Sequence, residues 1–319
     1  MGRRTLLRAA GAALAAGSTG AGHAATYPSR TITLLVPYAA GGNADFTARM
    51  FAEALTKTIG QTVIVENKGG GGGSIGATHV IGSAPDGHTL MFSAPGVLSV
   101  TPHLVKVGYT LAGIKPVCMV SKTPLVLVVR KGSKYKSLNA LIQAAKSDPL
   151  PMGYSGLGTP NHLAMLNLES VGKVRFSGVA YRGSGPMLQD ILAGHIEVAA
   201  DQISTSRPYI ASGDLVPIAV FGQPLEALPN VPSVSTLGPE PFDSTTYLGI
   251  AAPAGTPDAV VATIQKAAQA ALEDPKFVAG MDKLGSSVHW GPAQEYERAM
   301  RSEDAFMKQM VADGRIKPQ

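Results

Sequence analysis

The organisation of this chain is set by the stretch Val36-Pro37-Tyr38-Ala39-Ala40-Gly41-Gly42-Asn43-Ala44-Asp45-Phe46. It follows an apolar run over 32–36 that is typical of a buried strand, and it leads into a helical pattern that ends at Gly60. The loop offers little but backbone, together with an asparagine placed as an N-cap. The first turn of a helix presents unpaired N–H groups at the positive end of the helix dipole. The stretch is therefore either an ordinary strand-to-helix turn or an anion site.

The same order of strand, glycine-rich loop and helix start occurs twice more. A strand over 151–154 leads into Ser155-Gly156-Leu157-Gly158-Thr159-Pro160-Asn161-His162, where Thr159 is placed as an N-cap and Pro160 at the first helical position. A strand over 179–181 leads into Arg182-Gly183-Ser184-Gly185 and a helix over 186–193. Strands that alternate with helices imply parallel α/β sheets with right-handed crossovers, in which ligands bind beyond the carboxyl ends of the strands. If two such sheets face each other, the three loops converge on one cleft.

We expect the chain to pass between two lobes. The apolar runs 117–120 and 125–130 are split by Ser121-Lys122-Thr123-Pro124, and the run 215–221 reads as the strand that returns to the first lobe. The expected first lobe therefore covers 25–123 and 222–319, and the second covers 124–221. Further strands are expected over 62–66, 89–92, 196–200 and 247–252. Further helices are expected over 75–83 and 138–146, from 257 after a Thr256 cap, from 275 after Asp274, and from 292 to about 313.

The first 24 residues read as a secretory signal. Arg3, Arg4 and Arg8 form a basic start, an apolar segment covers 6–16, and Gly22-His23-Ala24 resembles a cleavage site. The basic start also resembles a twin-arginine signal, so the general secretory route and the twin-arginine route both stay open. The apolar segment is too short to span a bilayer, and we expect a soluble mature protein in the periplasm.

Charge and cysteine content exclude some classes of protein. The signal holds three arginines and no acid, so its removal would take the net charge from +5 to +2. A charge this small, without a Lys/Arg stripe, gives no case for nucleic acid as a partner. Cys118 is the only cysteine, so no intrachain disulfide can form, and its apolar surroundings predict a small core residue.

Motifs for catalysis, metals and nucleotides are absent or weak. None of the seven histidines falls in a metal-binding spacing, and Ser155 lacks the flanking glycines of a nucleophile elbow. Gly71, Gly73 and Gly76 match G-x-G-x-x-G, but the following strand ends without the acidic residue that a dinucleotide site uses. A flexible glycine loop is favoured there. We expect no cofactor, no metal and no catalysis.

Short motifs along the whole mature chain then occur in the order of a known family. The mature chain resembles the substrate-binding proteins of the tripartite tricarboxylate transporter system, the Bug family. The resemblance is carried by Tyr27-Pro28-Ser29-Arg30, Val36-Pro37-Tyr38, Gly41-Gly42-x-x-Asp45, Val65-Glu66-Asn67, Ala84-Pro85-Asp86-Gly87, Gly156-x-Gly158-Thr159-x-x-His162-Leu163, Tyr181-x-Gly183-Ser184, Leu228-Pro229-x-Val231-Pro232 and Ala252-Pro253-Ala254-Gly255-Thr256-Pro257.

This resemblance implies the α/β fold of a two-lobed periplasmic binding protein of type II, with a hinge and a ligand cleft between the lobes. It implies a monomeric receptor that captures a small organic carboxylate and delivers it to integral-membrane transporter subunits. In such proteins the loop after the first strand and the glycine loop of the second lobe hold a carboxylate, partly through backbone and ordered water. Two opposed helix N-termini, each worth on the order of 1 kcal/mol, agree with that. A sensor that signals to a membrane kinase is the alternative.

The resemblance and the loop positions together predict the ligand-binding residues. The first-lobe loop is expected to supply Tyr38, Ala40, Gly41, Gly42, Asn43, Ala44 and Asp45. Ser93 and Ala94 end a strand beside it. The second lobe is expected to supply Ser155, Gly158, Thr159, His162, Arg182 and Asp201.

Several of these positions have two interpretations. Tyr38 packs on the ligand or walls the strand end, and Asp45 contacts the ligand or only starts the helix. His162 reaches the solute or orders its loop. Arg182 pairs a distal carboxylate or lies at a solvated rim. Asp201, if it faces the ligand, would repel a second carboxylate and favour an amine or a hydroxyl.

One position departs from the family pattern. The loop usually has Thr before its Asp, and here that residue is Ala44, so one hydroxyl donor is lost. A less polar or bulkier acid is therefore compatible with the site, and the sequence does not name the acid.

Overall fold

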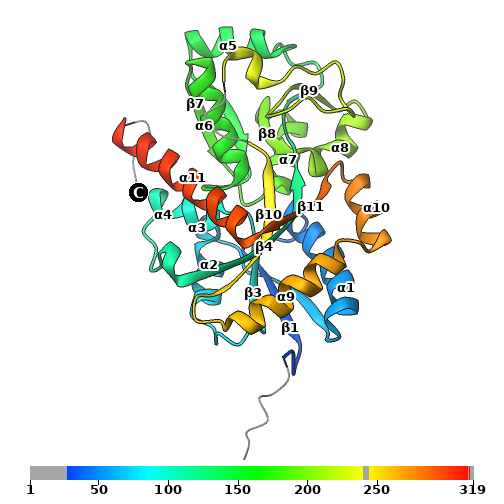
Figure 1. Ribbon diagram of the computed structural model, residues 1–319. Coiled ribbons are helices and arrows are strands. Elements are labelled where there is room, and N and C mark those ends of the chain that lie inside the picture. Colours follow the sequence, from blue (N-terminus) through cyan, green and yellow to red (C-terminus); the bar gives the residue numbers. More distant parts are fainter. Residues whose placement is uncertain (1–26, 240–243, 315, 317–319) are drawn as a thin grey trace, which may run out of the picture.

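The computed structural model describes residues 27–239, 244–314 and 316, so the expected signal over 1–24 lies outside the described residues. Two lobes, each built on one sheet, are stacked along the long axis of the molecule (Figure 1). The first sheet has the order β11-β4-β10-β3-β1-β2. Its strands are β1 (Ile32–Val36), β2 (Val63–Asn67), β3 (Thr89–Ser93), β4 (Ile114–Thr123), β10 (Thr246–Pro253) and β11 (Ser287–Pro292).

The second sheet has the order β7-β6-β8-β5-β9. Its strands are β5 (Leu125–Arg130), β6 (Leu150–Tyr154), β7 (Phe176–Ala180), β8 (Val198–Gln202) and β9 (Leu215–Val220). The chain therefore passes from the first sheet to the second between β4 and β5, and back between β9 and β10. The lobe boundaries expected from the sequence stay a prediction.

Both sheets are mixed, so the prediction of parallel sheets is wrong. β1 runs parallel to β2 and β3, as βα units require, but β10 runs antiparallel to β3 and β4. In the second sheet β5 runs antiparallel to β8 and β9. β5 and β10 are the strands by which the chain enters a lobe from its neighbour. They start where the ordinary βα strands end, and so they run in the opposite direction.

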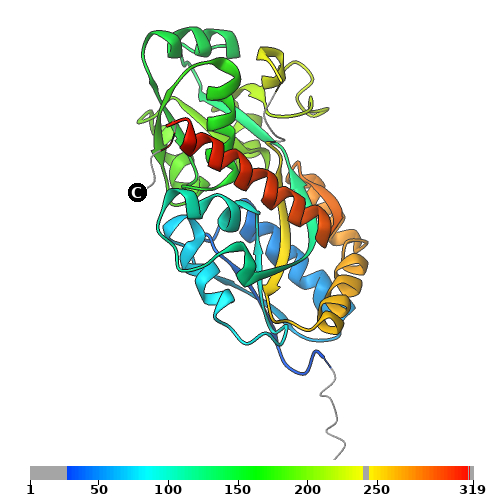
Figure 2. The ribbon, with the colours of Figure 1, turned by 60° about the vertical axis from the view of Figure 1, so that its left-hand side comes forward.

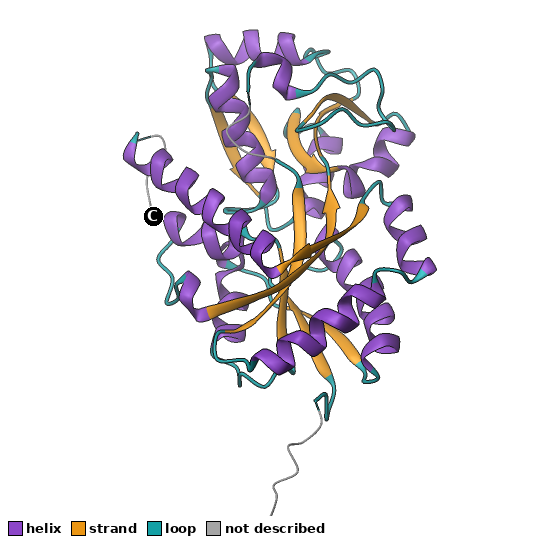
Figure 3. Ribbon diagram, in the orientation of Figure 1, coloured by secondary structure: helices purple, strands orange, loops and turns teal. Residues whose placement is uncertain are grey.

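Helices cover both faces of each sheet (Figure 3). The helices of the first lobe are α1 (Asn43–Ile59), α2 (Ser74–Ile81), α3 (Gly96–Ser99), α4 (Thr101–Leu104), α9 (Asp258–Ala271), α10 (Pro275–Lys283) and α11 (Ala293–Ala312). Those of the second lobe are α5 (Leu138–Ser147), α6 (Pro160–Gly172), α7 (Ser184–Ala193) and α8 (Ile203–Ala211).

The cores follow the alternation of the strands. In β1, Leu34 packs with α1, α9 and α10, while Leu35 faces α2, α3 and α11. In β5, Leu127 packs toward α5 and α6, while Val128 faces α7 and α8. Each sheet thus buries apolar side chains on both faces, which explains why its strands read as continuous apolar runs. Cys118 is one of the buried residues, as expected.

Helix ends agree with the sequence signals at several places. Gly60 ends α1 and Gly194 ends α7, both in the left-handed conformation. The Thr159 side chain caps α6. Thr256 does not cap α9, which begins after Pro257 without a side-chain cap. Helix α8 and strand β11 were not predicted; α8 contains Pro208, which is typical of a helix boundary rather than of an interior.

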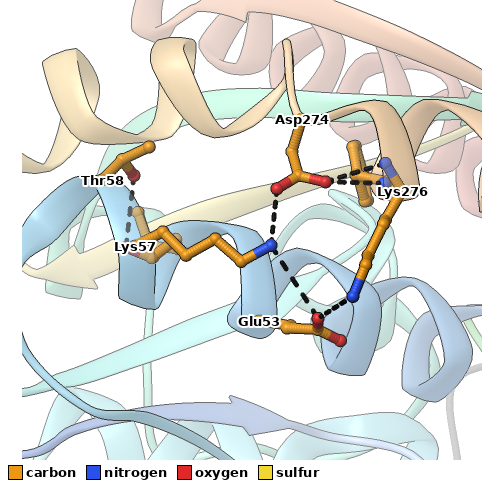
Figure 4. Close-up of polar contacts among 7 residues, drawn as sticks. Glu53, Lys57, Thr58, Asp274 and Lys276 are labelled. Atoms are coloured by element: carbon orange, nitrogen blue, oxygen red, sulfur yellow. Dashed lines mark hydrogen bonds and ion pairs between the residues drawn. The ribbon is translucent and has the colours of Figure 1, made fainter.

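Charged side chains join α1 and α10 on the outside of the first lobe (Figure 4). Helix α10 begins after Asp274, as predicted; the Asp274 side chain caps it and accepts a hydrogen bond from Lys57 Nζ of α1 at 2.7 Å. Glu53 lies 3.8 Å from Lys57 Nζ and 3.5 Å from Lys276 Nζ. The lysines and Glu53 are exposed, so each of these pairs contributes little to the stability of the lobe.

Helix α11 starts in the first lobe and ends against the core of the second. Figure 2 shows it running diagonally across the molecule from one lobe to the other. Tyr296 and Met300 pack in the first lobe, whereas Met307 and Met310 pack in the core of the second. The helix therefore links the lobes in addition to the two strand crossings.

Candidate functional site

A cavity of about 220 Å³ lies between the lobes. It is smaller than the roughly 300–1,000 Å³ of sites for drug-sized molecules, so it suits a small solute. The first lobe contributes Tyr38, Ala39, Ala40, Gly42, Asn43, Ala44, Asp45, Ala94, Thr246 and Leu248 to its wall. The second lobe contributes Ser155, Thr159, Pro160, Arg182, Gly183, Ser184, Gly185, Pro186 and Gln202.

Four helices begin at this wall. Gly42, Thr159, Gly183 and Gln202 are the N-cap residues of α1, α6, α7 and α8, and all four line the cavity. Each helix directs unpaired N–H groups and the positive end of its dipole toward its N-cap. Helices from both lobes therefore direct the positive ends of their dipoles at the cavity, an arrangement that suits an anion.

The first-lobe loop is held in place by Asp45. Gly41 has a φ of 85°, and its amide nitrogen donates to Asp45 Oδ2 at 3.0 Å. Arg49 pairs with Asp45 Oδ1 at 2.9 Å. Burial works against the charged form, but the hydrogen bonds from Arg49 and Gly41 outweigh it and lower the pKa of the carboxyl. Asp45 therefore stays ionised and braces the loop.

Asn43 does not cap α1, contrary to the prediction. Gly42 takes the N-cap position, so Asn43 is the first helical residue and its side chain turns inward. Its Oδ1 accepts hydrogen bonds from Ser204 Oγ at 2.9 Å and from Thr123 Oγ1 at 3.3 Å. Its Nδ2 is buried and has no partner among the described residues, and the same is true of Thr246 Oγ1. Both residues line the cavity, but these two atoms are themselves buried beneath its surface.

Thr159 and His162 shape the second-lobe loop. Thr159 Oγ1 donates to the carbonyl of Gly156 at 2.7 Å and accepts from the amide of His162 at 3.4 Å. His162 Nδ1 accepts from the amide of Gly158 at 3.3 Å, and the imidazole stacks on Tyr154 at 4.6 Å. Burial lowers the pKa of His162 to about 4, so the ring is neutral at physiological pH. His162 thus orders the loop.

Asp201 lies behind the wall. It is 0% exposed and does not line the cavity. Its carboxylate accepts hydrogen bonds from Ser184 Oγ at 2.6 Å, Thr205 Oγ1 at 2.6 Å, Ser206 Oγ at 2.7 Å and Asn161 Nδ2 at 3.1 Å. Desolvation raises its pKa. The carboxylate ties together the first turns of α6, α7 and α8.

The structure brings most of the predicted site residues to one cavity. On its wall lie Tyr38, Ala40, Gly42, Asn43, Ala44, Asp45, Ala94, Ser155, Thr159 and Arg182. Behind or beside the wall lie Gly41, Ser93, Gly158, His162 and Asp201. Their contact with a ligand stays a prediction.

Sequence reasoning missed part of the wall. Gln202 directly follows Asp201, so the strand end that indicated Asp201 as a site residue also indicates Gln202. Ser184 stood in the third glycine loop but was not selected. Thr246 and Leu248 lie on β10, which carries no loop motif, and only the folded chain shows that they reach the cavity.

The described residues offer neither a metal centre nor a membrane-spanning helix. No group of three or more His, Cys, Asp or Glu side chains is placed to hold a metal ion. Within the same residues, no helix combines the length and the apolarity that crossing a membrane requires.

Several known proteins are similar to the chain along most of its length. BugT of Bordetella pertussis is 31% identical over 271 residues, which are 82% of each chain. A protein of Pseudomonas sp. strain P51, named only by its tcbD-tcbE intergenic region, is 31% identical over 99% of this chain and 96% of its own.

Several solved structures are also similar to the chain along most of its length. The periplasmic binding protein BugD superposes with a TM-score of 0.83 at 30% identity and covers 92% of this chain and 100% of its own. MatC of Rhodopseudomonas palustris, solved with bound malate, gives a TM-score of 0.81 at 29% identity over 89% of this chain and 100% of its own. A second R. palustris protein, solved with adipate, gives a TM-score of 0.84 at 28% identity and covers 92% of this chain and 100% of its own.

The matches confirm both the resemblance and the two-lobed fold inferred from the sequence. Residues 47–314 match the family described as "Tripartite tricarboxylate transporter family receptor". The chain belongs to this family of periplasmic binding proteins, which are substrate-binding receptors and not enzymes.

Proposed function

We propose that this protein binds a small organic carboxylate in the cavity between its lobes and delivers it to integral-membrane subunits of a tripartite transporter. The observation that carries the proposal is the convergence of four helix N-termini on one small cavity. MatC and its R. palustris relative, each solved with a dicarboxylate, support it. Transport is favoured over signalling to a kinase because the family is described as a transporter receptor.

The remaining features of the proposal come from the sequence. An N-terminal signal over 1–24 would export the chain to the periplasm by the general secretory or the twin-arginine route. We propose that the mature protein acts as a monomer, binds no nucleic acid, and neither makes nor breaks a bond in its solute.

Thermal unfolding with added solutes tests the proposal. A solute that binds only the folded state stabilises it by RT ln(1 + [L]/Kd), or about 2.7 kcal/mol at a hundredfold excess over Kd. Protein freed of carried-over ligand by unfolding and refolding is scanned with mono-, di- and tricarboxylates and with amino acids. At least one carboxylate is expected to raise Tm. A folded protein that responds to no carboxylate would overturn the proposal.

A pair of glycine variants locates the binding. A Cβ on Gly42 would meet only the carbonyl oxygen of Ala39, in ordinary contact at 4.0 Å, and the backbone there is extended, so Gly42→Val is expected to add a side chain at the cavity wall without strain. Gly108→Val makes the same change on the exposed surface, also in open space. The carboxylate response is expected to disappear in Gly42→Val and to persist in Gly108→Val.

A further inference from the structure

The cavity wall carries few charges. Among the described residues that line it, Asp45 and Arg182 hold the only carboxylate and the only cationic group. Asp45 is occupied, because it accepts from the Gly41 amide and pairs with Arg49. Arg182 has no acidic partner within the described part of the chain, whereas Arg49 and Arg175 each pair an acidic side chain. Arg182 is thus the one cationic residue of the described cavity lining, and it is left available for an anion.

The backbone on either side of Arg182 is fixed. The amide of Tyr181 donates to the carbonyl of Tyr154 at 3.0 Å, and the amide of Gly183 donates to the carbonyl of Ser155 at 2.9 Å. A Cβ on Gly183 would lie 3.9 Å from the Cβ of Ala39, so this loop faces the first-lobe loop across the cavity. Arg182 is therefore presented at the junction of the two lobes, next to the start of α7.

Among the described residues, the one acidic side chain on the cavity wall, Asp45, is already engaged by the Gly41 amide and by Arg49, so an ammonium ion finds no free carboxylate there. Asp201, the strand-end carboxylate expected from the sequence to favour an amine, is 0% exposed and already accepts four side-chain hydrogen bonds. Four helix N-termini add positive potential around the same space. An ammonium group on the solute would be desolvated there beside like charge, which is costly.

We propose that Arg182 is a specificity-determining residue that pairs with a second carboxylate of the solute, and that the cavity discriminates against acids that carry an ammonium group. This inference rests on the proposed function, because it assumes that a first carboxylate lies at the helix N-termini. The preferred class is then a dianionic acid without an amine. Arg182 is exposed at the rim, so its effect is moderate, about tenfold in Kd.

Titration calorimetry on matched acids tests this. The probes are succinate, its half-amide succinamate, and aspartate, with adipate, adipamate and 2-aminoadipate as the longer set. Wild type is expected to bind the better diacid about tenfold more tightly than its half-amide, and also more tightly than its amino derivative. In Arg182→Gln the affinity for the diacid is expected to fall about tenfold, while the affinity for the half-amide changes by less than about twofold. Arg301→Gln on α11 makes the same charge change away from the cavity and is expected to keep the wild-type ratio.

The outcomes separate two kinds of failure. If wild type binds acids but Arg182→Gln keeps the preference for the diacid, or weakens diacid and half-amide equally, the role of Arg182 is overturned and the proposed function stands. Aspartate binding as tightly as succinate would overturn the discrimination against ammonium. If wild type binds no acid of any kind, the proposed function fails together with this inference.

Discussion

His162, in the second-lobe loop, is expected to make the free energy of unfolding depend on pH. Its pKa of about 4 means that between roughly pH 6.5 and 4 the unfolded chain binds a proton that the folded chain does not. The free energy of unfolding therefore falls as pH falls through this window, by about 3 kcal/mol over its full width. His162→Asn keeps an acceptor for the Gly158 amide and is expected to lose this part of the slope. Urea unfolding from pH 7 to 4 measures it, and parallel curves for the two proteins would contradict the assignment.

Glu303 is expected to act in the opposite direction. It lies on α11, accepts from Ser99 Oγ at 2.6 Å, and burial raises its pKa to about 7. Between roughly pH 4.5 and 7 the folded chain holds a proton that the unfolded chain has released, so stability falls as pH rises. Glu303→Gln is expected to be more stable than wild type at pH 8 and equal to it below pH 4.5. Urea unfolding at these two pH values decides this; a variant less stable at pH 8 would show that the charged form is favoured.

Single residues also show how far the sequence could predict the site. Thr159 was recognisable because its N-cap position, the following proline and the glycine loop are adjacent in the chain. Asp201 was misleading, because its surroundings depend on α8, and Pro208 hid that helix. Thr246 had no local signal at all, since its place on the wall arises from a strand that lies far along the chain from all three glycine loops.

At the scale of elements, the two lobes approach each other closely at two glycines, Gly72 and Gly96. A Cβ on Gly96 of α3 would lie 2.4 Å from the carbonyl oxygen of Gly158, and one on Gly72 would lie 2.7 Å from that of Leu157. Neither distance is tolerable for a real Cβ atom, so glycine is required for this approach. The glycine run over 69–73, which the sequence marked only as a flexible loop, therefore packs through Gly72 against the loop that carries Thr159.

This contact predicts an effect on binding from outside the cavity. Gly96→Ala is expected to hold the lobes apart near the Gly158 loop and so to raise Kd for any bound carboxylate roughly tenfold, with the far-UV circular dichroism unchanged. Gly108→Ala, where nothing lies near, is the control. Equal affinity in Gly96→Ala and wild type would show that the contact is not part of the binding conformation.

The best-predicted elements belong to βα units whose strand, loop and helix each have a recognisable local sequence pattern. The strands before the three glycine loops and the helices after them followed from local patterns. Strand direction did not, because β5 and β10 run antiparallel as a result of entering from the other lobe. No short-range sequence pattern indicates that a strand enters its sheet from the other lobe.

At the scale of the whole molecule, three connections cross between the lobes. Two are the links β4–β5 and β9–β10, and the third is α11, whose Met307 and Met310 pack in the second core. Links of this kind allow two lobes to move about a hinge while the cavity wall stays divided between them. Solute binding is therefore expected to favour the conformation in which the α1 and α6 N-termini face each other.

A crystal structure of the complex with the best-bound carboxylate would show directly how the solute is held. We expect one carboxylate of the solute between Gly42 and Thr159, with oxygens about 3 Å from main-chain amides, or from one ordered water, at the starts of helices from both lobes. A solute bound outside this cavity, or held there by side-chain charges with no helix N-terminus from one of the lobes, would contradict this expectation.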